Sequence, residues 1–184
     1  VVLTPAAEKM PGAVKKAIEL QSQIANSFIP QQFENPANPS IHRVTTAPEI
    51  LQQTEGKLDV FVATAGTGGT ITGTGEALKE HLPNLQVIVV EPKGSPVLSG
   101  GEPGPHKLVG TSPGFVPAIL NTDVYDEIVQ VADEHAIQTT RDLARLEGIL
   151  VGPSAGAAVW TAIQKARVLG PGKRVLCIAP DNGE

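Results

Sequence analysis

The sequence predicts an α/β fold, with a mostly parallel, twisted sheet and helices on both of its faces. Short apolar runs rich in β-branched residues alternate along the chain with longer stretches of helical periodicity, which is typical of a parallel sheet. The clearest unit is a strand over residues 59–63, a helix that ends near His81, and a strand over Gln86–Glu91. Such a β-α-β unit crosses over right-handed. The 184 residues, 41% of them hydrophobic, are enough for one good core.

The N-terminal part contains fewer clear elements of this sheet. Residues 1–4 have the composition of a strand, and residues 11–26 carry apolar side chains at helical spacing. Residues 28–33 predict a short strand, which Pro30 restricts to an edge or to a strand start. Two Asn-Pro pairs within residues 35–39 predict a turn-rich hinge. We therefore expect a domain boundary here, between residues 1–38 and residues 39–184.

Beyond the hinge, Thr46 and Glu49 have the spacing of a capping box, which predicts a short helix to about Thr54. Residues 92–118 break the alternation with many prolines and glycines; such a long irregular segment is usually functional or mobile, and the alternative is a plain surface excursion. A strand is predicted at 124–131, followed by a helix that Asp133 caps and that Gly148 closes after about Glu147. The remaining predicted elements are a short buried strand at 149–151, an Ala-rich helix ending near Gly170, and a strand at 174–179.

Composition excludes several function classes. A net charge of −5 and 3% aromatic residues argue against nucleic acid or an anionic membrane surface as the main partner. No apolar run reaches the roughly 20 residues that span a bilayer, and no secretory signal opens the chain, so we expect a cytoplasmic protein. Cys177, the single cysteine, excludes an internal disulfide and is expected to be a core residue. No Cys/His cluster has the spacing of a metal site, so no metal is expected.

The turn that follows the 59–63 strand has the composition of an anion-binding site. Three glycines, Gly66, Gly68 and Gly69, leave the backbone bare, and Thr67 and Thr70 add hydroxyl donors at the start of a helix. The P-loop pattern fails, because no Lys-Ser/Thr follows the glycines. The dinucleotide pattern matches only its first two glycines, although Glu91 could bind a ribose. We interpret the turn as a phosphate cradle; a nucleotide site and a turn without a ligand remain alternatives.

A second turn of this kind surrounds Ser154. Serine is a favoured N-cap, and the small residues after it let a helix pack closely on the sheet, so a structural role is favoured here from the residues alone. The stretch Gly152–Gly156 also matches the nucleophile pattern G-x-S-x-G. That pattern requires a histidine later in the chain. All four histidines, His42, His81, His106 and His135, precede Ser154, so a hydrolase is disfavoured.

Taken together, these stretches resemble the family of pyridoxal-phosphate enzymes that includes cysteine synthase (O-acetylserine sulfhydrylase), the enzymes of fold type II. The resemblance extends over essentially the whole chain. It rests on five motifs, at residues 31–39 (Gln-Gln-Phe-Glu-Asn-Pro-Ala-Asn-Pro), 66–70 (Gly-Thr-Gly-Gly-Thr), 104–107 (Gly-Pro-His-Lys), 110–117 and 152–156 (Gly-Pro-Ser-Ala-Gly), and on the final Pro-Asp-Asn-Gly-Glu.

The resemblance implies a site for pyridoxal 5'-phosphate. Its phosphate would be held by Gly66, Thr67, Gly68, Gly69 and Thr70, and its pyridine nitrogen would accept a hydrogen bond from the Ser154 hydroxyl. Gln32 would bind the substrate carboxylate with Phe33 packed nearby, and the loop that begins at Gly110 would border the substrate entrance and move on closure. The implied reaction is a β-replacement that makes L-cysteine from O-acetyl-L-serine and sulfide. The nearest alternative within the family is a cystathionine β-synthase.

The resemblance also implies what this chain lacks. In the family a lysine anchors the cofactor covalently and a Ser/Thr/Asn-Gly loop binds the substrate carboxylate, and no lysine of this sequence has the matching motif. We therefore expect residues 1–38 to be the remainder of a smaller N-terminal domain and residues 39–184 to be a cofactor-binding domain without its tail. Such a fragment has no catalytic residue of its own, would be inactive, and would be poorly soluble alone. The implied partners are a second copy, as a homodimer, and the C-terminal tail of serine acetyltransferase.

Overall fold

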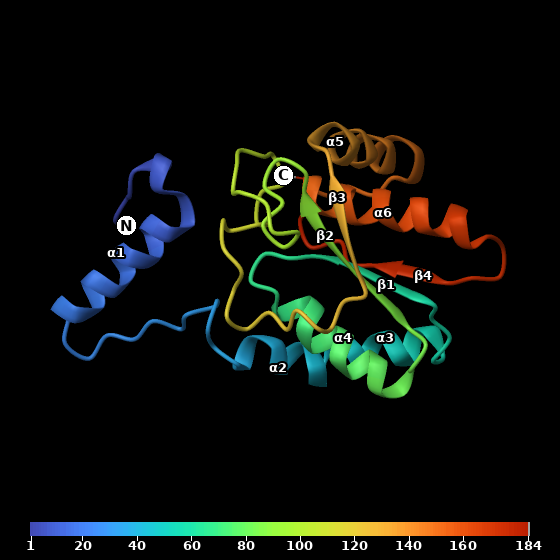
Figure 1. Ribbon diagram of the computed structural model, residues 1–184, viewed down its shortest axis with the longest axis horizontal. Helices are drawn as coiled ribbons and strands as arrows, with labels where there is room; N and C mark the ends of the chain where they lie inside the picture. Colours follow the sequence, from blue (N-terminus) through green and yellow to red (C-terminus); the bar gives the residue numbers. More distant parts are fainter. Residues whose placement is uncertain (184) are drawn as a thin grey trace.

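The computed structural model describes residues 1–183, and within them one parallel sheet forms the centre of the molecule (Figure 1). Its strand order is β3-β2-β1-β4. The strands are β1 (Val60–Thr64), β2 (Gln86–Pro92), β3 (Glu127–Val131) and β4 (Val175–Cys177). Each neighbouring pair is parallel, and β1 lies between β2 and β4. The α/β fold and the β-α-β unit expected from the sequence are confirmed.

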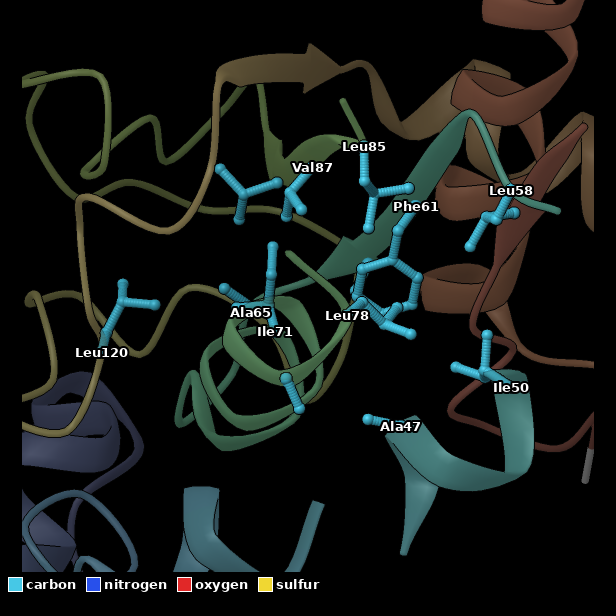
Figure 2. Close-up of a cluster of buried hydrophobic side chains, with 13 residues drawn as sticks. Ala47, Ile50, Leu58, Phe61, Ala65, Ile71, Leu78, Leu85, Val87 and Leu120 are labelled. Atoms are coloured by element: carbon cyan, nitrogen blue, oxygen red, sulfur yellow. The ribbon is translucent and has the colours of Figure 1, made fainter. Parts of the chain in front are cut away.

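Helices cover both faces of the sheet. On one face lie α2 (Ala37–Val44), α3 (Thr46–Thr54) and α4 (Gly69–His81), and on the other lie α5 (Asp133–Asp142) and α6 (Pro153–Leu169) (Figure 1). Successive side chains of a strand point to opposite faces. Phe61 accordingly packs with Ile71 and Leu78 of α4 (Figure 2), whereas Val60 and Val62 pack with Ala157 of α6. The central strands β1 and β2 are largely apolar because both of their faces are buried, whereas the edge strand β3 carries Glu127 and the exposed Gln130.

The N-terminal segment has no strand. It consists of η1 (Ala6–Glu8), the helix α1 (Lys9–Gln23), which lies apart from the sheet in Figure 1, and an irregular stretch that leads to α2. The strands predicted at residues 1–4 and 28–33 are therefore wrong. Val1, Leu3 and Phe28 are exposed, so their apolar character reflects no strand pairing in this chain. The domain division at residue 38 stays a prediction.

The predicted hinge at residues 35–39 is instead the start of α2. Its N-cap is Pro36, and Pro39 lies in the first turn, where a helix needs no backbone N–H from a proline. The capping box predicted for α3 is also wrong. The N-cap is Thr45, which makes no side-chain cap, and the Thr46 hydroxyl pairs with His42 Nδ1 at 2.9 Å.

The predicted helix at 133–147 is α5 continued by a π-helical turn, η2 (Leu143–Glu147), and Gly148 closes it in the left-handed conformation. Asp133 is its first residue, not its cap, which is Ala132. The strand predicted at 149–151 is reduced to one bridge between Val151 and Asn182, with Ile149 and Leu150 exposed. None of the helices within residues 1–183 has the length and apolarity to cross a membrane.

Candidate active site

The turns that precede α4 and α6 meet at one cavity, at the carboxyl ends of β1 and β4. The cavity holds about 270 Å³. Its lining joins the turn before α4, the loop around Gly110, the start of α6 and the residues after β4; it comprises Thr64, Gly66, Thr67, Gly68, Thr70, Val109, Gly110, Thr111, Ser154, Pro180 and Asp181. This is the edge at which open α/β sheets bind ligands. The phosphate-cradle turn and Ser154, 84 residues apart counted from Thr70, therefore line the same space.

The first turn has no room for side chains at its glycines. Gly68 is the N-cap of α4 with φ +86°, a conformation that favours glycine. A Cβ on Gly66 would collide with the Gly110 carbonyl oxygen, and one on Gly69 would collide with Asn38 Oδ1. The glycines are thus required by close approach of the backbone to its neighbours, and they leave the start of α4 uncovered.

The two threonines of this turn are each held by a side chain of α2. Asn38 Nδ2 donates to Thr67 Oγ1 at 2.9 Å, and His42 Nε2 lies 3.2 Å from Thr70 Oγ1. Burial lowers the pKa of His42 below its ordinary value, so the imidazole is neutral at pH 7. The first turn of α4 adds backbone N–H groups without helical acceptors and a partial positive charge. The turn is therefore a set of neutral donors that suits an anion.

The second turn presents a hydroxyl rather than amides. Ser154 is buried, and its Oγ donates to the Val109 carbonyl at 2.7 Å. It is not the N-cap of α6, which is Gly152. The carboxylate of Asp181 takes the role of the cap, because it accepts from Ser154 N at 2.9 Å and Ala155 N at 2.7 Å. The amides at the start of α6 are thus already bonded to an anion of the protein itself.

The residues expected to bind substrate line an adjoining cavity. It holds about 340 Å³ and is bordered by Gln32, Phe33 and Gly110. It shares Gly66, Thr67, Gly110 and Thr111 with the first cavity, so the two spaces are neighbours. Phe33 is buried and packs edge-to-face on Phe115, with ring centroids 5.1 Å apart.

The irregular segment at 92–118 contributes to both cavities. It contains no helix or strand beyond the end of β2, and its residues Gly110 and Thr111 line both spaces. Ser112 N donates to the Ala65 carbonyl at 3.0 Å, which ties this loop to the first turn. Movement of the loop that begins at Gly110 on closure stays a prediction.

Glu91 does not face this site, which counts against the nucleotide alternative. Its buried carboxylate accepts from Leu98 N at 2.8 Å, from Ser99 N at 3.2 Å and from the Ser99 hydroxyl. These bonds hold the irregular segment against the end of β2. A ribose could not use this carboxylate without breaking them, so the role considered for Glu91 is wrong.

The sequence analysis assigns no role to three residues around the site, Asn38, His42 and Asp181, although Asn38 and Asp181 lie within motifs of the resemblance. Asn38 and His42 lie four residues apart on one face of α2, a spacing that a helix at 37–44 would have suggested. Asp181 reaches its partners across 26 and 27 residues of chain, so no local pattern indicates it.

The other candidate groups have structural roles. Cys177 packs at the edge of the core, and burial raises the pKa of its thiol, which keeps it protonated. No group of metal-binding side chains occurs among residues 1–183. The described lining of the first cavity includes no lysine, and Lys9, which borders the adjoining cavity, donates its Nζ to the Gly104 carbonyl at 3.1 Å.

The sequence profile described as pyridoxal-phosphate dependent enzyme matches residues 1–181. The chain belongs to this family. A probable cysteine synthase of Bacillus subtilis (strain 168) is 65% identical over 187 residues, which cover 100% of this chain and 60% of that protein. The crystal structure of an O-acetylserine dependent cystathionine beta-synthase from Helicobacter pylori is 44% identical with a TM-score of 0.95, over 100% of this chain and 60% of that one.

A hydrogen sulfide-producing enzyme from Fusobacterium nucleatum is 39% identical with a TM-score of 0.96, over 100% of this chain and 62% of that one. The fold of this pyridoxal-phosphate dependent enzyme family member is therefore that of fold type II. The chain spans about 60% of the length of the curated relative quoted above.

The site of this pyridoxal-phosphate family member fits its cofactor by the chemistry of its donors. A phosphate ester is an acceptor of hydrogen bonds, and the first turn offers bare amides and threonine hydroxyls. A pyridine nitrogen is a single neutral acceptor, and the second turn offers a single neutral hydroxyl.

Proposed function

We propose that the intact protein carries out a pyridoxal-phosphate dependent β-replacement that makes L-cysteine from O-acetyl-L-serine and sulfide. One observation carries this proposal above the others: Thr67 and Ser154, from two separate turns, line one cavity. The first turn supplies donors for a phosphate, and the second supplies a hydroxyl for a ring nitrogen. The names of the relatives supply the reaction class.

The residues of the first turn bind and orient. Gly66, Gly68 and Gly69 allow an anion to approach the backbone, and Thr67 and Thr70 complete its hydrogen bonds. These contacts would bind the phosphate, a part of the cofactor that does not react, and their role would be to orient the rest of the group in the cavity. Bound pyridoxal phosphate supplies the electron sink for chemistry at the substrate Cα.

Ser154 sets how strong that electron sink is. To donate to a ring nitrogen, the hydroxyl would give up its hydrogen bond to the Val109 carbonyl, so the new bond would replace one worth about 1 kcal/mol. A neutral serine leaves the nitrogen unprotonated, unlike a carboxylate. Such a nitrogen would make the bound cofactor a weaker electron sink, which would suit the elimination of acetate from the substrate.

The adjoining cavity is the proposed substrate site. The Gln32 amide would donate to the substrate carboxylate, and the buried Phe33 would form an apolar wall beside it. The Gly110 loop lies between this space and the cofactor cavity, so it is placed to close over a bound amino acid.

The test is an assay of the intact protein with O-acetylserine and sulfide, with cysteine as the measured product. The likeness to an O-acetylserine dependent cystathionine beta-synthase favours a second candidate, in which a thiol amino acid replaces sulfide. Measuring cysteine and cystathionine in parallel distinguishes the two. An intact protein that forms neither product from O-acetylserine would contradict the proposal.

We also infer that residues 1–184 alone do not turn over substrate, because the described cavity lining offers no lysine to anchor the cofactor. Borohydride reduction of the cofactor-loaded intact protein should fix the cofactor on a lysine that is not Lys9; labelling of Lys9 would overturn this inference. A homodimer and docking of a serine acetyltransferase tail remain proposals for the intact protein, testable by its mass in solution and by titration with the tail peptide.

A further inference from the structure

The side-chain amide of Asn38 connects the two cavities. Asn38 lies in the first turn of α2, half-buried, and its Nδ2 donates to two acceptors, the Gln32 carbonyl at 2.9 Å and Thr67 Oγ1 at 2.9 Å. An amide nitrogen has two N–H groups, so both are used. One bond holds the backbone of the proposed substrate segment, and the other holds a hydroxyl of the phosphate turn.

The bond to Thr67 determines which hydrogen bond that hydroxyl can still make. Thr67 Oγ1 also accepts from Gly69 N at 3.3 Å. A hydroxyl has two lone pairs and one proton, and with both lone pairs engaged only the proton is left for a ligand. The Thr67 hydroxyl is therefore set as a donor at the wall of the first cavity, which is the role that a phosphate, a pure acceptor, requires.

The position of the Asn38 amide is itself fixed by close packing. Its Oδ1 lies against Gly69, at a place where a Cβ on that glycine would collide with it. The main chain of α2 packs equally closely on α4, since a Cβ on Gly73 would meet the Pro39 carbonyl. The amide therefore has little freedom to turn away from Thr67.

We propose that Asn38 is a positioning residue, which sets the Thr67 hydroxyl as a hydrogen-bond donor to the cofactor phosphate and ties that contact to the Gln32 segment. The inference rests on the proposed role of residues 66–70 as the phosphate cradle. Asn38 itself does not touch the cofactor, because it acts through the Thr67 oxygen and does not line the first cavity.

The test measures binding to the intact apo protein of two probes, pyridoxal phosphate and pyridoxal, by absorbance titration. Asn38→Asp keeps the size of the side chain but replaces the donors with acceptors, so Thr67 must donate to it and loses its donor role. We expect pyridoxal phosphate to bind about tenfold more weakly and pyridoxal to bind within about twofold of the unchanged protein. The matched control is Asn35→Ala, which removes the amide bond to the Pro30 carbonyl and the acceptor of Ala37 N in the same segment but no bond to Thr67, and should change either affinity by less than about twofold.

A double-mutant cycle with Asn38→Ala and Thr67→Val tests whether Asn38 acts through Thr67. In the Thr67→Val background, Asn38→Ala should weaken the binding of pyridoxal phosphate by less than about twofold. The positioning role would be overturned, with the cradle intact, if Asn38→Ala weakened pyridoxal phosphate binding equally in both backgrounds. It would also be overturned if Asn38→Asp weakened the binding of pyridoxal as much as that of pyridoxal phosphate. If Thr67→Val itself left pyridoxal phosphate binding unchanged, the cradle assignment would fall together with the inference. The assay involves no substrate, so failure of the proposed reaction is a separate result.

Discussion

The turns before α4 and α6 are both rich in small residues, and they differ in what their amides face. The N-cap of α4 is Gly68, which has no side chain, and the side chain that accepts from this helix start is the neutral Thr67 hydroxyl, at 3.3 Å from Gly69 N, so the start of that helix is open toward the cavity. The turn before α6 is closed, because Asp181 accepts the N–H groups of Ser154 and Ala155. A small-residue turn is thus an anion site only where no carboxylate from elsewhere in the chain has taken its place.

This difference lets one cavity receive a ligand with unlike ends. The open turn keeps the partial positive charge of its helix, which favours a phosphate. In the closed turn the Asp181 charge offsets that of α6, and the neutral Ser154 hydroxyl is what remains for a ligand. A cavity with two open turns would favour the binding of two anionic groups, and a cavity with two turns closed by carboxylates would favour the binding of none. Changes in either turn test this reasoning.

The largest effect is expected at Gly69. Gly69→Ala puts a Cβ into Asn38 Oδ1 and forces α2 and α4 apart, which should lower the unfolding free energy of the intact apo protein by about 2–3 kcal/mol. It should also abolish measurable pyridoxal phosphate binding. Urea unfolding and absorbance titration measure the two effects. The control is Gly100→Ala, at φ +81° in open space, which should cost about 1 kcal/mol and leave binding unchanged. Equal behaviour of the two variants would show that the first turn does not depend on its bare backbone.

Opening the second turn should have the next largest effect. Asp181→Ala leaves the N–H groups of Ser154 and Ala155 without their acceptor, and the loss of a cap of this kind costs about 1–2 kcal/mol. Asp181→Asn retains one acceptor oxygen and should lose about half as much. Urea unfolding of the intact apo protein measures both variants. If Asp181→Ala were as stable as the unchanged protein, the contrast between an open and a closed turn would have no energetic basis.

The buried hydroxyl of the second turn should contribute less to stability. Ser154→Ala removes the donor to the Val109 carbonyl and should lower the unfolding free energy of the apo protein by about 1 kcal/mol. The control is Thr161→Val on the same helix. The Thr161 hydroxyl donates to the Ala157 carbonyl, which already accepts a helical backbone bond, so this variant should leave the unfolding free energy nearly unchanged. A loss no larger for Ser154→Ala than for Thr161→Val would indicate that the Val109 bond does not hold the serine.

The sequence predicts the central β-α-β unit well because each part carries its own local signal. Residues 60–63 and 87–90 are apolar and buried on both faces, and Gly66–Gly69 mark the turn between strand and helix. The same rules fail where the signal comes from elsewhere. The apolar residues 1–4 have no strand beside them, so their composition alone predicts a structure that they do not form.

The start of α2 shows how one residue type can indicate two structures. The prolines at 36 and 39 predict a hinge, but both positions are ones that a helix tolerates, the N-cap and the first turn. Once this helix is missed, the shared face of Asn38 and His42 is missed with it. The glycines, threonines and Ser154 were found because they lie in the turns themselves, whereas Asn38, His42 and Asp181 act on those turns from other elements.

The smallest expected effect concerns pH and the first turn, where His42 contacts Thr70 through Nε2 and Thr46 through Nδ1. Burial holds the pKa of His42 below its ordinary value of 6.5, so on acidification the unfolded chain binds the proton first. This histidine therefore lowers the unfolding free energy as pH falls below 6.5, and the loss is complete once the pH is under the folded-state pKa. His42→Gln should flatten the dependence between pH 7 and pH 5 in urea unfolding of the apo protein, because the groups that remain titrate alike in both proteins. A slope that is unchanged, or steeper in the variant, would show that the imidazole beside Thr70 is as easily protonated when folded as when unfolded, and the first turn would then tolerate a cation at its side.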